Sequence, residues 1–348
     1  MDSKKALIGM SGGVDSSVAA YLTQQAGFSC IGATMRLLEG TDSDTADARR
    51  IASLLGMEFY ELDFRSQFRE KVMDDFADCY EAGLTPNPCI VCNRELKFGS
   101  LLEAALEMGC AYVVTGHYAR IGKQSDGRYV LRKAADEAKD QSYFLYKLTQ
   151  HQLAHTRFPL GTLTKEEARA IAEAQGFINA RKRDSQDICF VPDGDYKAFL
   201  ERYTGKCYPG GDFLDRDGNT VGRHSGAVGY TIGQRKGLGL AMGAPVYVCG
   251  KDMVKNTVTV GPNGALYSCS LRANNWNWVS LPCLTEPLRV KAKARSRMTE
   301  QDATVYPEEN GFCQVVFDEP QRALTPGQAV VLYDGDTVVG GGTITEVL

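Results

Sequence analysis

Short apolar runs alternate with amphipathic stretches through the first third of the chain. The amphipathic stretches place apolar residues at helical spacing, as at Ala48, Ile51, Ala52 and Leu55. The pattern predicts strands at residues 6–10, 29–35, 58–62 and 111–115, and helices at residues 15–25, 44–55, 66–81 and 94–108. Such alternation indicates parallel strands joined by right-handed crossovers, which is a doubly wound α/β sheet.

The pattern changes after residue 190. One more helix is expected at residues 195–202, and from Gly226 onward short β-type runs are separated by Gly, Asn and Pro. These runs are residues 246–249, 257–260, 288–294, 313–317, 329–333 and 338–345. Several short strands with turns between them predict a β-barrel or a β-sandwich.

Length and cysteine content narrow the class of protein. A chain of 348 residues predicts two or three domains, at roughly 100–200 residues per domain. No apolar run approaches the ~20 residues of a membrane span, and the first residues are not apolar enough for a signal peptide. The 11 cysteines are an odd number in a long chain, unlike a secreted disulfide scaffold. We therefore expect a cytoplasmic protein with no membrane partner and mostly free thiols.

The first expected strand ends in a loop rich in glycine and serine, Ser11-Gly12-Gly13-Val14-Asp15-Ser16-Ser17, which leads into a helix. Free N–H groups and the helix dipole at such a position bind anions, and glycine allows close approach. The loop lacks the lysine of the GxxxxGK[ST] motif, and Asp15 suits a phosphate carried with Mg²⁺. The loops after Met10, Met35 and Thr115 should meet here, at the carboxyl ends of the strands. The alternative is an ordinary strand–turn–helix connection.

Two cysteines lie in a segment that favours reactivity. Cys89 and Cys92 follow a Thr-Pro-Asn-Pro stretch, and Cys92 lies just before the helix expected from Arg94. A helix N-terminus and nearby cations, here Arg94 and Lys97, lower the pKa of a thiol. Cys189 lies far along the chain, beside a second basic cluster.

The net charge of −4 argues against general affinity for nucleic acid, but one stretch is locally basic. Residues 289–297 alternate cations with small or apolar residues. In a strand, the cations would lie on one face about 6.6 Å apart, from a rise of ~3.3 Å per residue, and could follow a phosphate backbone. The alternative is a solvated edge strand. The cations are Arg289, Lys291, Lys293, Arg295 and Arg297.

The glycine-rich loop resembles the signature of the PP-loop ATP pyrophosphatases, which adenylate a substrate oxygen. Further motifs make the chain similar to the tRNA-specific 2-thiouridylase family over essentially its whole length. They are Thr85-Pro86-Asn87-Pro88 with Cys92-Asn93 and Lys97-Phe98-Gly99, residues 115–120 (TGHYAR), residues 139–145 (KDQSYFL), Asp184-Ser185 with Ile188-Cys189-Phe190, residues 233–239 (GQRKGLG), residues 325–328 (TPGQ) and the three glycines at 340–342.

The resemblance implies a reaction. ATP with Mg²⁺ adenylates the C2 oxygen of wobble uridine 34 in tRNA, and a persulfide on Cys189 delivers sulfur to C2. The sulfur donor would be a cysteine desulfurase, a relay protein or free sulfide. Cys92 then attacks the persulfide to release sulfide, or closes a disulfide with Cys189 as the product leaves, and thiol–disulfide exchange allows both versions.

The resemblance also implies site residues. The ATP site would comprise Gly9, Met10, Ser11, Gly12, Gly13, Val14, Asp15, Ser16, Ser17, Met35 and Gly116. The flipped base would lie against Asn87, Pro88 and Cys89. The other tRNA contacts would be His117, Lys139, Asp140, Gln141, Arg295, Ser296 and Gln328. From the residues alone, His117 could instead be a structural histidine at a strand end.

Cys89 departs from the family pattern, because many members carry an aspartate there. The change puts any carboxylate-dependent step in doubt and creates a CxxC pair. Together with Cys189, Cys89 and Cys92 could hold a [4Fe–4S] cluster whose free iron binds hydrosulfide. A zinc site and a redox pair fit the spacing as well. Persulfide chemistry at Cys92 and Cys189 without a metal is the other possibility.

We predict a PP-loop ATP-binding catalytic domain (residues 1–190), a small central domain (191–262) and a C-terminal β-barrel that binds tRNA (263–348). Two other functions are weighed against tRNA thiolation. A PP-loop synthetase or amidotransferase acting on a small molecule would need neither Cys92 nor Cys189. A non-catalytic RNA-binding protein would show no tRNA-stimulated release of AMP and pyrophosphate.

Overall fold

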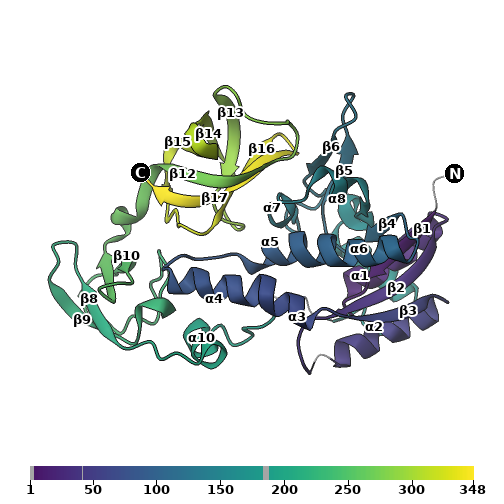
Figure 1. Ribbon diagram of the computed structural model, residues 1–348, viewed down its shortest axis with the longest axis horizontal. Coiled ribbons are helices and arrows are strands. Elements are labelled where there is room, and N and C mark those ends of the chain that lie inside the picture. The colour runs from purple at the N-terminus through teal and green to yellow at the C-terminus, as the bar shows by residue number, and fades with distance from the viewer. Residues whose placement is uncertain (1–3, 41, 183–187) are drawn as a thin grey trace.

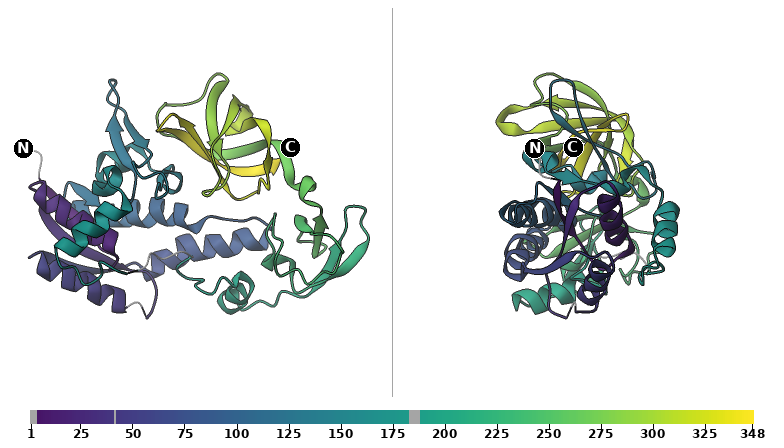
Figure 2. Two further views of the ribbon diagram at one scale, coloured as in Figure 1. Left: turned by 180° about the vertical axis from the view of Figure 1, so that it is seen from behind. Right: turned by 90° about the vertical axis from the view of Figure 1, so that its right-hand side faces the viewer.

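Three sheets organise the protein in the computed structural model, which describes residues 4–40, 42–182 and 188–348. They are a parallel sheet of five strands, a mixed sheet of four, and an antiparallel sheet of eight that closes on itself. The parallel sheet lies at the end with the N-terminus, the mixed sheet at the opposite end, and the closed sheet above the helices between them (Figures 1 and 2). Among the described residues, no helix is long and apolar enough to cross a membrane.

The parallel sheet has the strand order β3-β2-β1-β4-β7. β1 is central, and its Ala6, Leu7 and Ile8 are fully buried because apolar cores cover both faces of the sheet. The four strands expected in this region are all present, with ends within one residue of the prediction, and the α/β class is confirmed. The strands are β1 (Lys5–Gly9), β2 (Ser29–Arg36), β3 (Glu58–Asp63), β4 (Tyr112–Val114) and β7 (Thr156–Arg157).

The order of strands reverses next to β1, because the chain passes from β1 to β2 on one side and later returns to β4 on the other. Ligands bind at such a switch point in open α/β sheets. The helices that flank these strands and follow them are α1 (Val14–Gln25), α2 (Asp42–Leu54), α7 (Ser142–Leu145), α8 (Gln150–Ala154), α9 (Lys165–Ala174) and α10 (Tyr196–Thr204), with a 3₁₀ turn η3 (Pro159–Thr162).

Two long helical segments link the parallel sheet to the rest of the molecule, and each contains a π-helical stretch. The first is α3 (Arg65–Phe68), η1 (Arg69–Met73) and α4 (Asp74–Glu81); the second is α5 (Pro88–Cys92), η2 (Asn93–Ser100) and α6 (Leu101–Glu107). The expected start of the second segment at Arg94 is wrong. The helix begins at Pro88, because Asn87 is extended and proline tolerates the first helical position, where no N–H is needed. Cys92 therefore lies inside the helix rather than at its start.

The C-terminal sheet is the expected barrel, closed by pairing of its first and last strands. A hairpin from the N-terminal half, β5 (Arg120–Lys123) and β6 (Tyr129–Arg132), extends it at β17. The prediction contained no strand at this hairpin. The barrel strands are β12 (Tyr267–Trp278), β13 (Leu288–Lys293), β14 (Gln301–Pro307), β15 (Cys313–Arg322), β16 (Ala329–Asp334) and β17 (Thr337–Val347), with 3₁₀ turns η5 (Asn263–Leu266) and η6 (Glu309–Gly311).

The central sheet is small and packs around Phe213, Val248 and Val258. Its strands are β8 (Gly211–Leu214), β9 (Thr220–His224), β10 (Tyr247–Asp252) and β11 (Thr257–Gly261), with a 3₁₀ turn η4 (Ala227–Gly229). Lys251 on β10 lies over the ring of Tyr80 on α4, with Nζ 5.9 Å from the ring centroid. Burial lowers the pKa of Lys251 to about 8.

The prediction of five cations on one strand face is wrong. β13 ends at Lys293, and the chain then turns, with the N–H of Met298 donating to the carbonyl oxygen of Arg295. The first two cations are also paired: Arg289 bonds Asp318 of β15, and Lys291 lies 3.1 Å from Asp302 of β14. Alternation in the sequence continued past the point at which the backbone leaves the strand.

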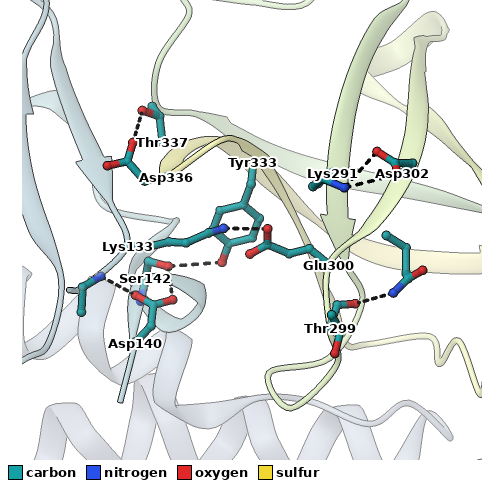
Figure 3. Close-up of polar contacts among 12 residues, drawn as sticks. Lys133, Asp140, Ser142, Lys291, Thr299, Glu300, Asp302, Tyr333, Asp336 and Thr337 are labelled. Atoms are coloured by element: carbon teal, nitrogen blue, oxygen red, sulfur yellow. Dashed lines mark hydrogen bonds and ion pairs between the residues drawn. The ribbon is translucent and has the colours of Figure 1, made fainter. Parts of the chain in front are cut away.

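The barrel is joined tightly to the parallel-sheet domain. Lys133, which directly follows β6, lies 2.6 Å from Glu300, and the hydroxyls of Ser142 and Tyr333 lie 3.3 Å apart; Figure 3 shows both contacts. Gly341 of β17 packs against Tyr146, which is only 1% exposed. One apolar core runs through both units, since it includes Leu7 of β1, Leu96 and Phe98 of η2, and Val331 and Tyr333 of β16.

Gly341→Ala should test this junction. A β-carbon at position 341 would lie 2.6 Å from Cδ2 of Tyr146 and 2.8 Å from the carbonyl oxygen of Val330. We expect a loss of about 1–3 kcal/mol in the free energy of unfolding, measured by urea titration, because overpacking a core costs that much. The control is Gly264→Ala, where the added carbon meets nothing within 4 Å. Equal stability of the two variants would contradict the packing described.

Candidate active site

The glycine-rich loop joins β1 to α1 at the carboxyl edge of the parallel sheet. Gly12 has a φ of +71°, which favours glycine, and Gly13 caps α1. The hydroxyls of Ser16 and Ser17 donate to the carbonyl oxygen of Gly13 at 2.9 and 3.1 Å, and the N–H of Ser11 donates to Ser16 Oγ at 3.2 Å. These bonds hold the loop in shape around the first turn of the helix, where N–H groups can bind a phosphate.

The neighbouring strand brings a second glycine against this loop. A β-carbon on Gly116, after β4, would lie 2.6 Å from the carbonyl carbon of Asp15 and 2.7 Å from the nitrogen of Ser16. On the other side, the N–H of Met10 donates to the carbonyl oxygen of Ala33 in β2 at 2.7 Å. The loops after Met10 and Thr115 therefore meet at the switch point between β1 and β4, whereas the place of the loop after Met35 in this site stays a prediction.

Asp15 is held by two residues that sequence reasoning missed. Lys165 Nζ lies 2.8 Å from both carboxylate oxygens, and the hydroxyl of Tyr118 donates to one of them at 2.9 Å. Lys165 is only 4% exposed, and a lysine is rarely buried to this extent unless it is paired with an acidic group, here Asp15. Sequence patterns hardly indicate this contact, because Lys165 lies at the first position of α9, 150 residues from Asp15.

Two further polar residues close over the loop. Asn179 Nδ2 donates to the carbonyl oxygen of Gly12 at 3.0 Å and to Ser17 Oγ at 2.9 Å. Its Oδ1 is buried and has no partner among the described residues, so it is available to a bound group. Lys182 pairs with Asp44 and Asp47 at 2.8 and 3.0 Å, beside the same loop. The N–H groups at the start of α1, the carboxylate of Asp15 and the two lysines fit a nucleoside triphosphate bound with Mg²⁺.

The three expected thiols occupy one region. Cys89 is the second residue of α5, Cys92 is its last, and Cys189 belongs to the segment that precedes α10. Cys92 is 9% exposed, whereas Cys89 and Cys189 are solvent-exposed. Cys89 and Cys189 both lie close enough to Cys92 to influence its pKa electrostatically. The structure therefore brings together residues that are nearly a hundred positions apart.

The expected low thiol pKa at Cys92 is wrong. Burial raises the pKa of Cys92 to about 11, and this effect outweighs the nearby cation Lys97, which lowers it. Cys89 and Cys189 reach solvent, but the protein packed around them desolvates them in part and raises the pKa of each, with Lys97 acting against it. The backbone N–H groups of Cys189 and Phe190 also lower the pKa of Cys189. The N-terminus of the helix, which was expected to stabilise a thiolate at Cys92, lies one turn before Cys92, at Pro88.

Lys97 is the cation that these thiols share. It lies on η2, five residues after Cys92, and a π-helical turn brings residues i and i+5 together. Its side chain is half-buried and also affects the pKa of the buried His117, which burial lowers well below its usual value. Asn93, the residue after Cys92, donates to the carbonyl oxygen of Phe144 at 3.1 Å. Its buried Oδ1 has no partner in the described part of the chain.

An iron–sulfur cluster would need three thiolates arranged around one metal centre. Within residues 4–40, 42–182 and 188–348, no group of three or more His, Cys, Asp or Glu side chains is arranged to hold a metal ion. Cys89, Cys92 and Cys189 all belong to these ranges and, as they lie in this structure, do not form such a group. Asp184 and Ser185 of the Cys189 motif lie outside the described residues.

Several expected RNA contacts make internal bonds. His117 bonds Thr115 at 2.7 Å and packs against Phe98 and Phe158, as a structural histidine would. Asp140 accepts from the N–H groups of Ala134 and Ser142, and Gln141 Oε1 accepts from the N–H of Tyr118 at 2.8 Å. Lys139 and Ser296 are half-buried. Contacts of these residues with RNA stay predictions.

Fold and site together define an α/β protein with a loop suited to a nucleotide and a separate cluster of three thiols. Residues 4–193 match the family described as tRNA methyl transferase HUP domain, residues 197–262 the tRNA methyl transferase PRC-barrel domain, and residues 268–344 the aminomethyltransferase beta-barrel domain.

Two curated relatives of known name show which family the chain belongs to. A protein of Acetivibrio thermocellus named tRNA-specific 2-thiouridylase MnmA is 49% identical, over 99% of this chain and 100% of its own. One of Clostridioides difficile with the same name is 48% identical, over 99% of each chain. The chain belongs to the tRNA-specific 2-thiouridylase family, and the resemblance inferred from its motifs is confirmed.

Solved structures are more distant. The U34-tRNA thiolase NcsA from Methanococcus maripaludis with its [4Fe-4S] cluster is 18% identical, with a TM-score of 0.36 over 58% of this chain and 68% of that one. An NMN synthetase from Francisella tularensis is 17% identical, with a TM-score of 0.36 over 59% and 78%. At these values, neither likeness supports an inference about this chain.

Lys97→Met should slow alkylation of the exposed thiols Cys89 and Cys189. Because Lys97 lowers their pKa, its loss raises the pKa, leaves less thiolate at a given pH, and moves the rate profile toward alkaline pH. We expect a several-fold lower iodoacetamide rate near neutral pH, measured by mass spectrometry of each cysteine peptide. Lys97→Arg keeps the charge and should keep the rate. Identical profiles for Lys97→Met and wild type would contradict the role of Lys97.

Proposed function

We propose that the protein catalyses ATP-dependent 2-thiolation of the wobble uridine U34 of tRNA. The observation that carries the proposal is the link that Lys97 makes between the three thiols and the nucleotide-binding loop. Lys97 lies close enough to Cys89, Cys92 and Cys189 to lower their pKa, and it also lowers the pKa of His117, the residue after the glycine that packs against the loop. Membership of a family whose curated members are named tRNA-specific 2-thiouridylase supports it. A synthetase acting on a small molecule would have no use for this thiol centre.

The first step activates the base. The C2 oxygen of uridine attacks the α-phosphate of ATP, pyrophosphate leaves, and AMP becomes bonded to C2 through oxygen. N–H groups at the start of α1 would bind the phosphates, and Lys165 would stabilise the negative charge that develops on them. Lys165 already neutralises Asp15, so Asp15 can bind Mg²⁺ only if Lys165 shifts toward the phosphates.

The second step transfers sulfur. The terminal sulfur of a persulfide on Cys189 attacks C2, and AMP leaves. The thiolate of Cys92 then attacks the sulfur of Cys189, so that a Cys92–Cys189 disulfide forms and the transferred sulfur stays on the base as thiocarbonyl. A thiol reductant restores both cysteines. Exposure of Cys189 suits loading by a sulfur donor, and burial of Cys92 suits a thiol that acts only within the protein.

The remaining assignments rest on the same proposal. The PP-loop, central and barrel domains are divided at residues 190/191 and 262/263, and the protein works in the cytoplasm, where its 11 free thiols stay reduced. Asn87, Pro88 and Cys89 line the base pocket, with Cys89 as a neutral thiol because its pKa is raised. The proposed route needs no cluster, because the persulfide on Cys189 carries the sulfur. The sulfur donor is a persulfide-bearing protein.

Replacing either reacting thiol should separate the two steps. Cys92→Ser and Cys189→Ser should lower thiolation by about 10³-fold or more, because the covalent route is lost, while tRNA-dependent pyrophosphate release continues. The measurement is thiouridine formation and pyrophosphate release in single turnover with a persulfide donor. Cys283→Ser, an exposed barrel thiol, is the matched control and should behave as wild type. Full thiolation by either variant would exclude the proposed route.

Neutralising Lys293 and Arg297 together should weaken the salt dependence of tRNA binding. Neither cation has an ion-pair partner among the described residues, whereas Arg289 and Lys291 are paired with Asp318 and Asp302. The slope of log K against log salt should become shallower by about 1.4–1.8, at roughly 0.7–0.9 per phosphate contact. Filter-binding titrations measure it. Neutralising Arg289 and Lys291 should change this slope less. A larger change for Arg289 and Lys291 than for Lys293 and Arg297 would remove Lys293 and Arg297 from the RNA surface.

A further inference from the structure

A turn of the barrel lies directly on the segment that leads into the thiol helix. The turn is Thr325-Pro326-Gly327-Gln328, between β15 and β16, and the segment is Thr85-Pro86. The N–H of Thr85 donates to the carbonyl oxygen of Pro326 at 3.0 Å. Gln328 Nε2 donates to the carbonyl oxygens of Thr85 at 2.8 Å and Pro86 at 3.4 Å. Both N–H bonds of the Gln328 amide are thus directed at the protein backbone.

Gly327 makes this close contact possible. Its φ is +90°, and a β-carbon there would lie 2.7 Å from the nitrogen of Thr85 and 2.9 Å from Cβ of Leu84. Any side chain at this position would push the turn and the segment apart. The backbone of the turn and that of residues 84–85 therefore touch without any side chain between them.

The turn is anchored on its other side by Arg295. Arg295 Nη2 donates to Thr325 Oγ1 at 2.6 Å and to the carbonyl oxygen of Ile232 in the central domain at 3.0 Å. Thr325 Oγ1 in turn donates to the carbonyl oxygen of Ala323 at 2.8 Å. Arg295, which sequence reasoning assigned to tRNA, here fixes the turn to both the barrel and the central domain.

These contacts act on the residues that carry the chemistry. Asn87 and Pro88 start α5 immediately after the clamped segment, and Cys89 and Cys92 follow within that helix. We propose that Gln328 is a positioning residue, which aligns the base pocket and the thiol helix by holding the backbone of Thr85 and Pro86. The barrel is then a structural part of the active site as well as a surface for RNA. This inference rests on the proposed thiolation and deepens it.

The chemistry explains why this alignment matters. Sulfur transfer requires the C2 atom, the persulfide and Cys92 to be in line within reacting distance, and a displacement of 1 Å can cost about 10²-fold in rate. A hydrogen bond from Gln328 to RNA would contribute to affinity, whereas a bond to Thr85 would contribute to the rate with bound tRNA. The two roles predict different kinetics.

Gln328→Glu provides the sharpest test, because the side chain keeps its size and loses the donor. We expect the single-turnover thiolation rate at saturating tRNA to fall by about 10- to 100-fold while Kd for tRNA changes by less than about twofold. Gln328→Ala should do the same. The matched control is Gln301→Ala, a barrel glutamine whose amide bonds only the nearby carbonyl oxygen of Thr299, and it should be unaffected.

Gly327→Ala tests the same contact without touching the amide. It should lower the saturated rate as Gln328→Glu does, whereas Gly264→Ala should not. Thermal unfolding of each variant identifies any that fails to fold. An unchanged saturated rate with weaker tRNA binding would overturn the proposal and make Gln328 an RNA contact. If the wild-type protein lacked thiolation with any donor, the proposed function would fail instead, irrespective of these variants.

Discussion

The helical segment that carries Cys89 and Cys92 is held by the packing of its apolar face, and much of the structure is arranged around it. Leu96, Phe98 and Leu101 are fully buried in a core shared by the parallel sheet and the barrel. Because interiors are close-packed, the helix cannot shift relative to one unit without disturbing the other. The nucleotide loop and the thiols therefore keep a fixed spacing although they belong to different parts of the chain.

Two lysines, Lys165 and Lys97, supply positive charge to the site, and their environments differ. Lys165 is buried and bonded to the carboxylate of Asp15, so that the loop is nearly neutral before it meets phosphate. Lys97 is half-buried, and it lowers the pKa of each thiol, which burial raises. In the proposed reaction, Lys165 would stabilise the phosphates of the substrate, and Lys97 would stabilise the anions that form on sulfur.

Much of this arrangement could be predicted from the sequence, and the exceptions have identifiable causes. Strands β1 to β4 and the loop at Gly12 follow from local patterns, and the thiols follow from family motifs. The hairpin β5–β6 was missed because its pairing partner is far along the chain, at Thr337. The start of α5 was misplaced at Arg94, although Pro88 suits the first position of a helix and does open this one. Lys165 and Gln328 contact Asp15 and Thr85 across the fold, which no local pattern encodes.

The hairpin that extends the barrel has a consequence for how the chain is made. Strand β6 leaves the ribosome long before β17, the strand that it pairs with, has been translated. For that interval a strand edge is open to other nascent chains, and such edges invite aggregation. Arg120, Lys123 and Arg132 place three cations on this ribbon, which discourages pairing with a similar edge. Completion of the barrel thus has to wait for the last strand of the protein.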